Sequence, residues 1–127
     1  MSNNIAFIGG GNMAAALISA MLQQGQLAAS IQVVEPSDEA RGNLKRRFGV
    51  DAIAQAGPSL TQADMVVWAV KPQVFRQAAQ DAGPLTTGAL HFSVAAGIRT
   101  DSMARWLGSQ RIIRAMPNTP ALIGQGV

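Results

Sequence analysis

The sequence predicts an α/β domain built on a doubly wound parallel sheet. Stretches typical of strands and of helices alternate along all 127 residues, which is the pattern of a parallel sheet with right-handed helical crossovers. The run M-V-V-W-A-V at residues 65–70 is apolar throughout, as expected of a strand buried on both faces. At residues 5–8, another apolar run leads directly into three glycines and an alanine-rich helical pattern. First strands of such domains connect to their first helix in this way.

Length and composition point to one globular domain, spanning residues 1–127. The chain is 48% hydrophobic and 13% charged, which excludes a disordered chain, and no apolar run approaches the about 18 residues that span a membrane. The net charge of +3 is mostly spread along the chain, so we expect neither a nucleic-acid nor a membrane partner. Cysteine is absent, which excludes disulfides and thiolate metal sites. Residues 1–4 lack a secretory pattern, and we expect a cytoplasmic protein.

The glycine-rich segment G-G-G-N-M-A at residues 9–14 matches the dinucleotide-binding pattern G-x-G-x-x-A. In that pattern the first glycine, Gly9, permits a tight turn, and Gly11 lacks the Cβ that would block a pyrophosphate. Ala14 allows close packing of helix on strand, and the helix directs its free N–H groups and positive dipole end at the same anion. A flexible loop is the alternative, but the position between strand and helix favours a nucleotide-binding turn.

The first helix is expected at residues 12–24, because apolar residues recur there at spacings of three and four. Gly25 ends it. The next strand covers residues 31–35, I-Q-V-V-E, and Pro36-Ser37-Asp38 breaks it and caps a second helix.

The end of that strand gives conflicting signals about the cofactor. An acid at this position favours NAD through the ribose 2′-OH, whereas basic groups favour the 2′-phosphate of NADP. Glu35 supplies the acid, and Ser37 and Arg41 follow within reach, with Lys45 on the face of Arg41. A solvated helix face is the alternative for the two basic residues. We expect NADPH as the preferred cofactor, with NADH accepted.

The remaining elements follow from the same patterns. Leu44 and Phe48 anchor the second helix and Gly49 ends it, while Pro72 suits the first turn of a later helix. The expected strands cover residues 50–53, 65–70, 89–95 and 111–116, and the expected helices cover residues 59–63, 72–82 and 101–107.

Four stretches together resemble one family: F-I-G-G-G-N-M-A at residues 7–14, A-V-K-P-Q at 69–73, S-V-A-A-G at 93–97 and R-A-M-P-N-T-P-A at 114–121. In this order and spacing they resemble the N-terminal, Rossmann-type NAD(P)-binding domain of pyrroline-5-carboxylate reductase, an oxidoreductase of proline biosynthesis. By position, the resemblance implies three groups of contacts: Gly9, Gly11, Asn12 and Met13 at the pyrophosphate; Ala69, Val70, Lys71 and Pro72 as a second cofactor contact; and Ala95, Gly97, Pro117, Asn118 and Thr119 beside nicotinamide or substrate.

Ordinary structural roles are the alternatives for several of these residues. Lys71 could be a surface side chain, Pro72 a helix start, and the Asn-Thr pair between prolines a plain turn. Neither His91 nor any metal-ligand cluster suggests a catalytic centre.

The reaction that the resemblance implies is hydride transfer from NAD(P)H to the C=N carbon of 1-pyrroline-5-carboxylate, which gives L-proline. Such a reaction needs orientation more than acid or base catalysis, and we assign no catalytic residue. The family's C-terminal helical domain, which grips the substrate and forms the homodimer, is absent from these residues. We therefore expect a fragment of a longer enzyme that binds dinucleotide but turns over little. The alternatives are another imine or β-hydroxyacid oxidoreductase and a non-catalytic nucleotide-sensing module.

Overall fold

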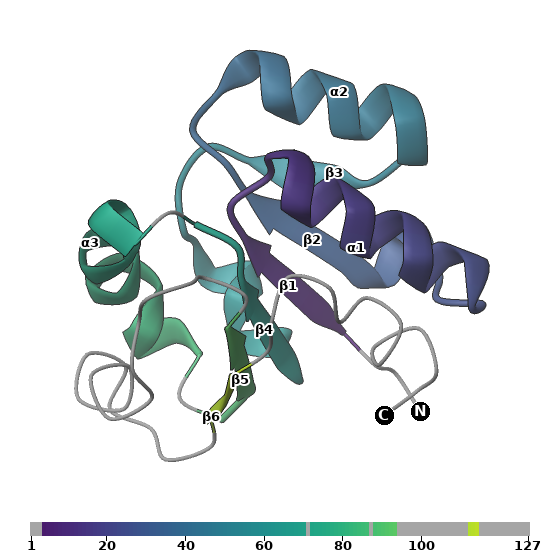
Figure 1. Ribbon diagram of the computed structural model, residues 1–127. Coiled ribbons are helices and arrows are strands. Elements are labelled where there is room, and N and C mark those ends of the chain that lie inside the picture. The colour runs from purple at the N-terminus through teal and green to yellow at the C-terminus, as the bar shows by residue number, and fades with distance from the viewer. Residues whose placement is uncertain (1–3, 71, 87, 94–111, 115–127) are drawn as a thin grey trace.

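A six-stranded, fully parallel sheet forms the centre of the domain (Figure 1). The computed structural model describes residues 4–70, 72–86, 88–93 and 112–114. Its strands lie in the order β3-β2-β1-β4-β5-β6, and every pair is parallel. They are β1 (Ile5–Ile8), β2 (Ile31–Val34), β3 (Asp51–Ile53), β4 (Met65–Trp68), β5 (Leu90–Ser93) and β6 (Ile112–Arg114). The doubly wound parallel sheet expected from the sequence is confirmed.

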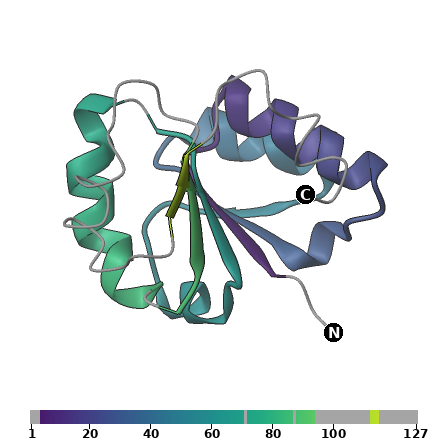
Figure 2. The same cartoon turned by 60° about the horizontal axis from the view of Figure 1, so that its bottom comes forward.

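Helices cover both faces of the sheet. Helices α1 (Asn12–Gln23) and α2 (Asp38–Phe48) lie on one side and α3 (Pro72–Ala82) on the other, as Figure 2 shows. Three short 3₁₀ helices complete the described elements: η1 (Ala28–Ser30), η2 (Pro58–Gln62) and η3 (Gly83–Leu85). The helix expected at residues 101–107 lies outside the described residues.

Alternation along β1 divides the core into two layers. Ile5 and Phe7 belong to the cluster on the side of α1 and α2, whereas Ala6 and Ile8 belong to the cluster under α3. Consecutive strand residues point to opposite faces, so a strand that is apolar at every position fits a sheet covered on both sides. This explains why β1 is buried at all four of its positions.

The ends of α2 follow the residues that predicted them. The Ser37 side chain accepts a hydrogen bond from the backbone N–H of Ala40 and caps the helix, and Gly49 ends it with φ of 70°. Two strands end earlier than expected, β2 at Val34 and β4 at Trp68. Pairing nevertheless continues one residue further, because the N–H of Ala69 donates to Ile8 O at 2.8 Å and that of Glu35 to Ile53 O at 2.8 Å.

Candidate functional site

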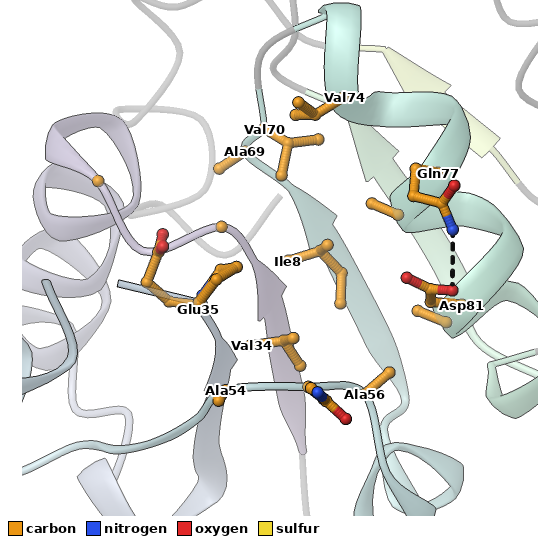
Figure 3. Close-up of a pocket in the computed structure, with 16 residues that line it drawn as sticks. Ile8, Val34, Glu35, Ala54, Ala56, Ala69, Val70, Val74, Gln77 and Asp81 are labelled. Atoms are coloured by element: carbon orange, nitrogen blue, oxygen red, sulfur yellow. Dashed lines mark hydrogen bonds between the residues drawn. The ribbon is translucent and has the colours of Figure 1, made fainter. Parts of the chain in front are cut away.

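A cleft of about 1080 Å³ opens at the carboxyl ends of the central strands (Figure 3). It lies where β1 is flanked by β2 on one side and β4 on the other, which is the point where the strand order reverses. Open parallel sheets bind ligands at this position. Five residues that the sequence predicted at a cofactor line the cleft: Gly9, Gly11, Glu35, Ala69 and Val70.

Gly9 is glycine because the protein backbone requires it. Its φ is +102°, and a Cβ at this position would lie 2.7 Å from the carbonyl oxygen of Ala69. Its N–H donates to Val34 O at 2.8 Å. The turn after β1 is thus held directly against the ends of β2 and β4.

No contact within the described part of the protein requires glycine at position 11. A Cβ built there would meet nothing within 4 Å. Gly11 is also the N-cap of α1, where no side chain caps the helix. The first hydrogen bond of the helix runs from Ala15 N–H to Gly11 O at 2.9 Å, so Asn12 and Met13 precede it and have no helical carbonyl as partner. The open space and these N–H groups fit a pyrophosphate.

Glu35 fastens the glycine turn to the loop after β2. One carboxylate oxygen accepts a hydrogen bond from Gly10 N–H at 2.8 Å, and the other accepts from Ser37 N–H at 2.9 Å. The sequence placed Glu35 near a ribose but did not predict this link. Because Gly10 N–H is already used, an anion at the turn would depend on the first-turn N–H groups of α1.

The polar groups predicted at the adenosine end lie together but bond to their own loop. Arg41 Nη1 donates to the carbonyl oxygens of Glu35 and Pro36, at 2.8 and 2.9 Å. Its other terminal nitrogen pairs with Asp38.

Lys45, which shares a helix face with Arg41 in the sequence, contacts Asp51 at 2.8 Å instead. The two cations therefore do not form a joint basic site.

The far wall of the cleft was not predicted from the sequence. It consists of the segment after β3 and one face of α3, and its residues are Ala54, Gln55, Ala56, Val74, Gln77, Ala78, Asp81 and Ala82. Gln77 donates to Asp81 at 3.2 Å (Figure 3). With Ile8 and Val34 as the apolar floor, this half of the cleft suits a flat ring system better than a second anion.

The other predicted contacts lie at the start of α3 or outside the described residues. Pro72 is the first residue of α3. Lys71, Ala95, Gly97, Pro117, Asn118 and Thr119 lie outside the described residues.

His91 is fully buried, and its Nδ1 accepts a hydrogen bond from Trp68 Nε1 at 3.0 Å. The residue has a structural role in the core, away from the cleft lining. In the described ranges, no group of three His, Asp or Glu side chains could hold a metal ion, and none of the helices there has the length and apolar character to cross a bilayer.

Comparisons with known proteins agree on one kind of domain. Residues 4–97 match the family model described as NADP oxidoreductase coenzyme F420-dependent. The chain is 44% identical over 124 residues to pyrroline-5-carboxylate reductase of Pseudomonas aeruginosa, covering 96% of this chain and 45% of that enzyme. It is 39% identical over 130 residues to the pyrroline-5-carboxylate reductase of Escherichia coli (strain K12), covering 100% of this chain and 48% of that enzyme.

A solved structure gives the same result. The pyrroline-5-carboxylate reductase of Coxiella burnetii superposes with a TM-score of 0.86 at 34% identity, over 97% of this chain and 47% of that chain. The chain spans about half the length of the curated relatives it matches.

Proposed function

The chain belongs to the family described as NADP oxidoreductase coenzyme F420-dependent, and we propose that it supplies the dinucleotide-binding domain of a pyrroline-5-carboxylate reductase. The proposed reaction is the NAD(P)H-dependent reduction of 1-pyrroline-5-carboxylate to L-proline, in proline biosynthesis. Curated relatives with that name, at 44% and 39% identity, support the substrate. The absence of cysteine supports a cytoplasmic location.

The contrast between Gly9 and Gly11 carries the proposal. Crowding by the protein backbone explains Gly9, whereas a Cβ on Gly11 would project into open space. A side chain there would nevertheless obstruct a ligand that approaches the uncapped start of α1. The pyrophosphate of a dinucleotide needs backbone N–H donors at close range and a helix N-terminus, and this turn offers both.

The residues of the chain bind and orient the cofactor rather than carry out the chemistry. The glycine turn and Asn12 and Met13 hold the pyrophosphate, and the adenosine ribose of NADPH or NADH lies beside Glu35, Ser37 and Arg41. Ala69 and Val70 form the second contact, joined by Lys71 and Pro72. A bound nicotinamide supplies the hydride for the imine carbon. Residues 95–97 and 117–119 are proposed to lie beside nicotinamide and substrate.

A complete site requires more chain than the 127 residues. The relatives are about twice as long, and we propose that a further domain grips the imine and forms a homodimer. The isolated chain should therefore bind the cofactor without efficient turnover, because a reaction that depends on orientation is lost when substrate is not held.

The test is a titration of the 127-residue chain with NADPH and NADH, observed as energy transfer from tryptophan to the reduced nicotinamide. Pyrroline-5-carboxylate is then added and proline is measured. We expect saturable binding and no proline above the non-enzymatic rate. Absence of binding by either cofactor would contradict the proposed site, and rapid proline formation would contradict the need for a further domain.

A further inference from the structure

The loop that would receive the adenosine ribose carries more negative than positive charge. Among the side chains that bond within the loop, Glu35 and Asp38 contribute two carboxylates and Arg41 one guanidinium, which leaves one uncompensated negative charge. Glu39, in the first turn of α2, adds a further and exposed carboxylate. The link from Glu35 to Gly10 N–H at 2.8 Å holds the charge of Glu35 beside the glycine turn. A 2′-phosphate brought to this loop would meet net repulsion.

Arg41, the cation that could offset the repulsion, is already engaged. It donates to two backbone carbonyls of its own loop and pairs with Asp38, and its side chain is only 22% exposed. A guanidinium binds phosphate best through a free bidentate edge. To present that edge, Arg41 would have to give up the Asp38 contact.

Ser37 is only partly engaged: its hydroxyl oxygen accepts the N–H of Ala40 at 3.2 Å as the cap of α2, and its O–H can still donate to a ligand oxygen. Its backbone N–H also donates to Glu35. Of the two residues that favoured a 2′-phosphate in the sequence, the neutral Ser37 hydroxyl thus keeps a donor, but the charged Arg41 has its terminal nitrogens engaged within the loop.

Glu35, in contrast, keeps capacity for a hydroxyl donor. Each carboxylate oxygen accepts one backbone N–H, at 2.8 and 2.9 Å, whereas a carboxylate has about four lone-pair sites in all. It can thus accept a ribose 2′-OH while it continues to fasten the turn. A phosphate has no proton to donate in its dianionic form and carries like charge.

We propose that Glu35 is a specificity-determining residue that makes this chain prefer NADH over NADPH. The proposal rests on the dinucleotide function of the cleft, and it reverses the preference that the sequence favoured. We expect NADH to bind about tenfold more tightly, a ratio that corresponds to about 1.4 kcal/mol.

The experiment compares dissociation constants of NADH and NADPH, measured by calorimetry, for the wild-type chain, Glu35→Gln and Glu39→Gln. Glu35→Gln keeps the side-chain length and removes the charge, so the preference for NADH should fall to near unity. Loosening of the glycine turn would weaken the binding of both cofactors equally. Loss of the charge would instead change the ratio of the two dissociation constants, so this ratio separates the two effects. Glu39→Gln removes the same charge from an exposed residue in the first turn of α2 and should keep the wild-type ratio.

Asp38→Asn provides a second test that does not depend on the stability of the turn. The Asp38 side chain is 93% exposed, and its neutralisation frees Arg41 for a 2′-phosphate. NADPH binding should strengthen about threefold relative to NADH, as expected for an exposed ion pair of below about 1 kcal/mol.

Tighter binding of NADPH by the wild-type chain, an unchanged ratio in Glu35→Gln, or no relative gain for NADPH in Asp38→Asn would overturn the proposal. If the wild-type chain bound neither dinucleotide, the proposed function itself would fail, which is a different result.

Discussion

Gly9 and Gly11 stand two residues apart and are glycine for different physical reasons. Gly9 combines a φ of +102° with a backbone oxygen 2.7 Å from where a Cβ would lie. Gly11 has an extended backbone conformation that other residues can adopt, and space around it. A substitution at Gly9 should therefore damage the fold, whereas one at Gly11 should damage only what the fold binds.

We predict that Gly9→Ala lowers the free energy of unfolding by at least about 2 kcal/mol, since strained backbone alone costs of order 1–3 kcal/mol and the contact with Ala69 adds to it. Urea unfolding followed by circular dichroism measures the change. Gly25→Ala is the matched control, because Gly25 has φ of +100° with nothing within 4 Å of a Cβ. Its loss should be smaller, and an equal loss in both variants would show that the contact with Ala69 contributes nothing.

For single residues, the sequence predicted the surroundings of the glycines better than the hydrogen-bond partners of the polar side chains. The tight turn at Gly9 and the open space at Gly11 agree with a local pattern of six residues. No local pattern predicts the bonds of Glu35, because Gly10 lies 25 residues away and the pairing depends on how β1 and β2 align. The engagement of Arg41 with backbone carbonyls is a property of the folded loop, and no spacing in the sequence encodes it.

Among the elements, the ends of a helix were predictable from the sequence, whereas the contact between two separate segments was not. The caps of α2 were predictable, because Ser37 and Gly49 act on backbone within a few residues of themselves. The wall that residues 54–56 and 74–82 form around the cleft was not predictable, because these residues lie outside the motifs and their approach depends on the crossover from β3 to β4.

Strands β4 and β5 share a buried polar link, from Trp68 to His91 at 3.0 Å. Both side chains are fully buried. An indole N–H can only donate, so Nδ1 of His91 carries no proton and acts as the acceptor. Replacing His91 with leucine leaves that donor without its acceptor in an apolar layer.

We predict that His91→Leu costs at least about 1–3 kcal/mol of stability, the usual penalty for a buried donor that loses its partner. His91→Asn, which keeps an acceptor close to the Nδ1 position, should recover part of the loss. Chemical denaturation gives the stabilities. Dissociation constants for NADH should stay the same in any variant that folds, and a weakened cofactor affinity would contradict the structural role given to His91.

For the whole molecule, the doubly wound parallel sheet was the most predictable property and the cleft the least. Alternating strand and helix patterns allow few topologies once crossovers are right-handed, and the observed order β3-β2-β1-β4-β5-β6 is one of them. The cleft arises only when the ends of β1, β2 and β4 and the face of α3 assemble. Its floor residues, Ile8 and Val34, read in the sequence as ordinary strand residues.

The central claim is that the open space at Gly11 is the place of a dinucleotide pyrophosphate. The most direct measurement compares NADH binding by the wild-type chain and by Gly11→Ala, each with its thermal unfolding midpoint. Gly88→Ala is the control, because Gly88 also has nothing within 4 Å of a Cβ but precedes β5, at the opposite end of the sheet from the cleft.

The account predicts equal unfolding midpoints for all three proteins without ligand. It also predicts NADH binding at least about tenfold weaker in Gly11→Ala alone, a loss of about 1.4 kcal/mol or more. Unaltered NADH affinity in a folded Gly11→Ala chain would contradict it.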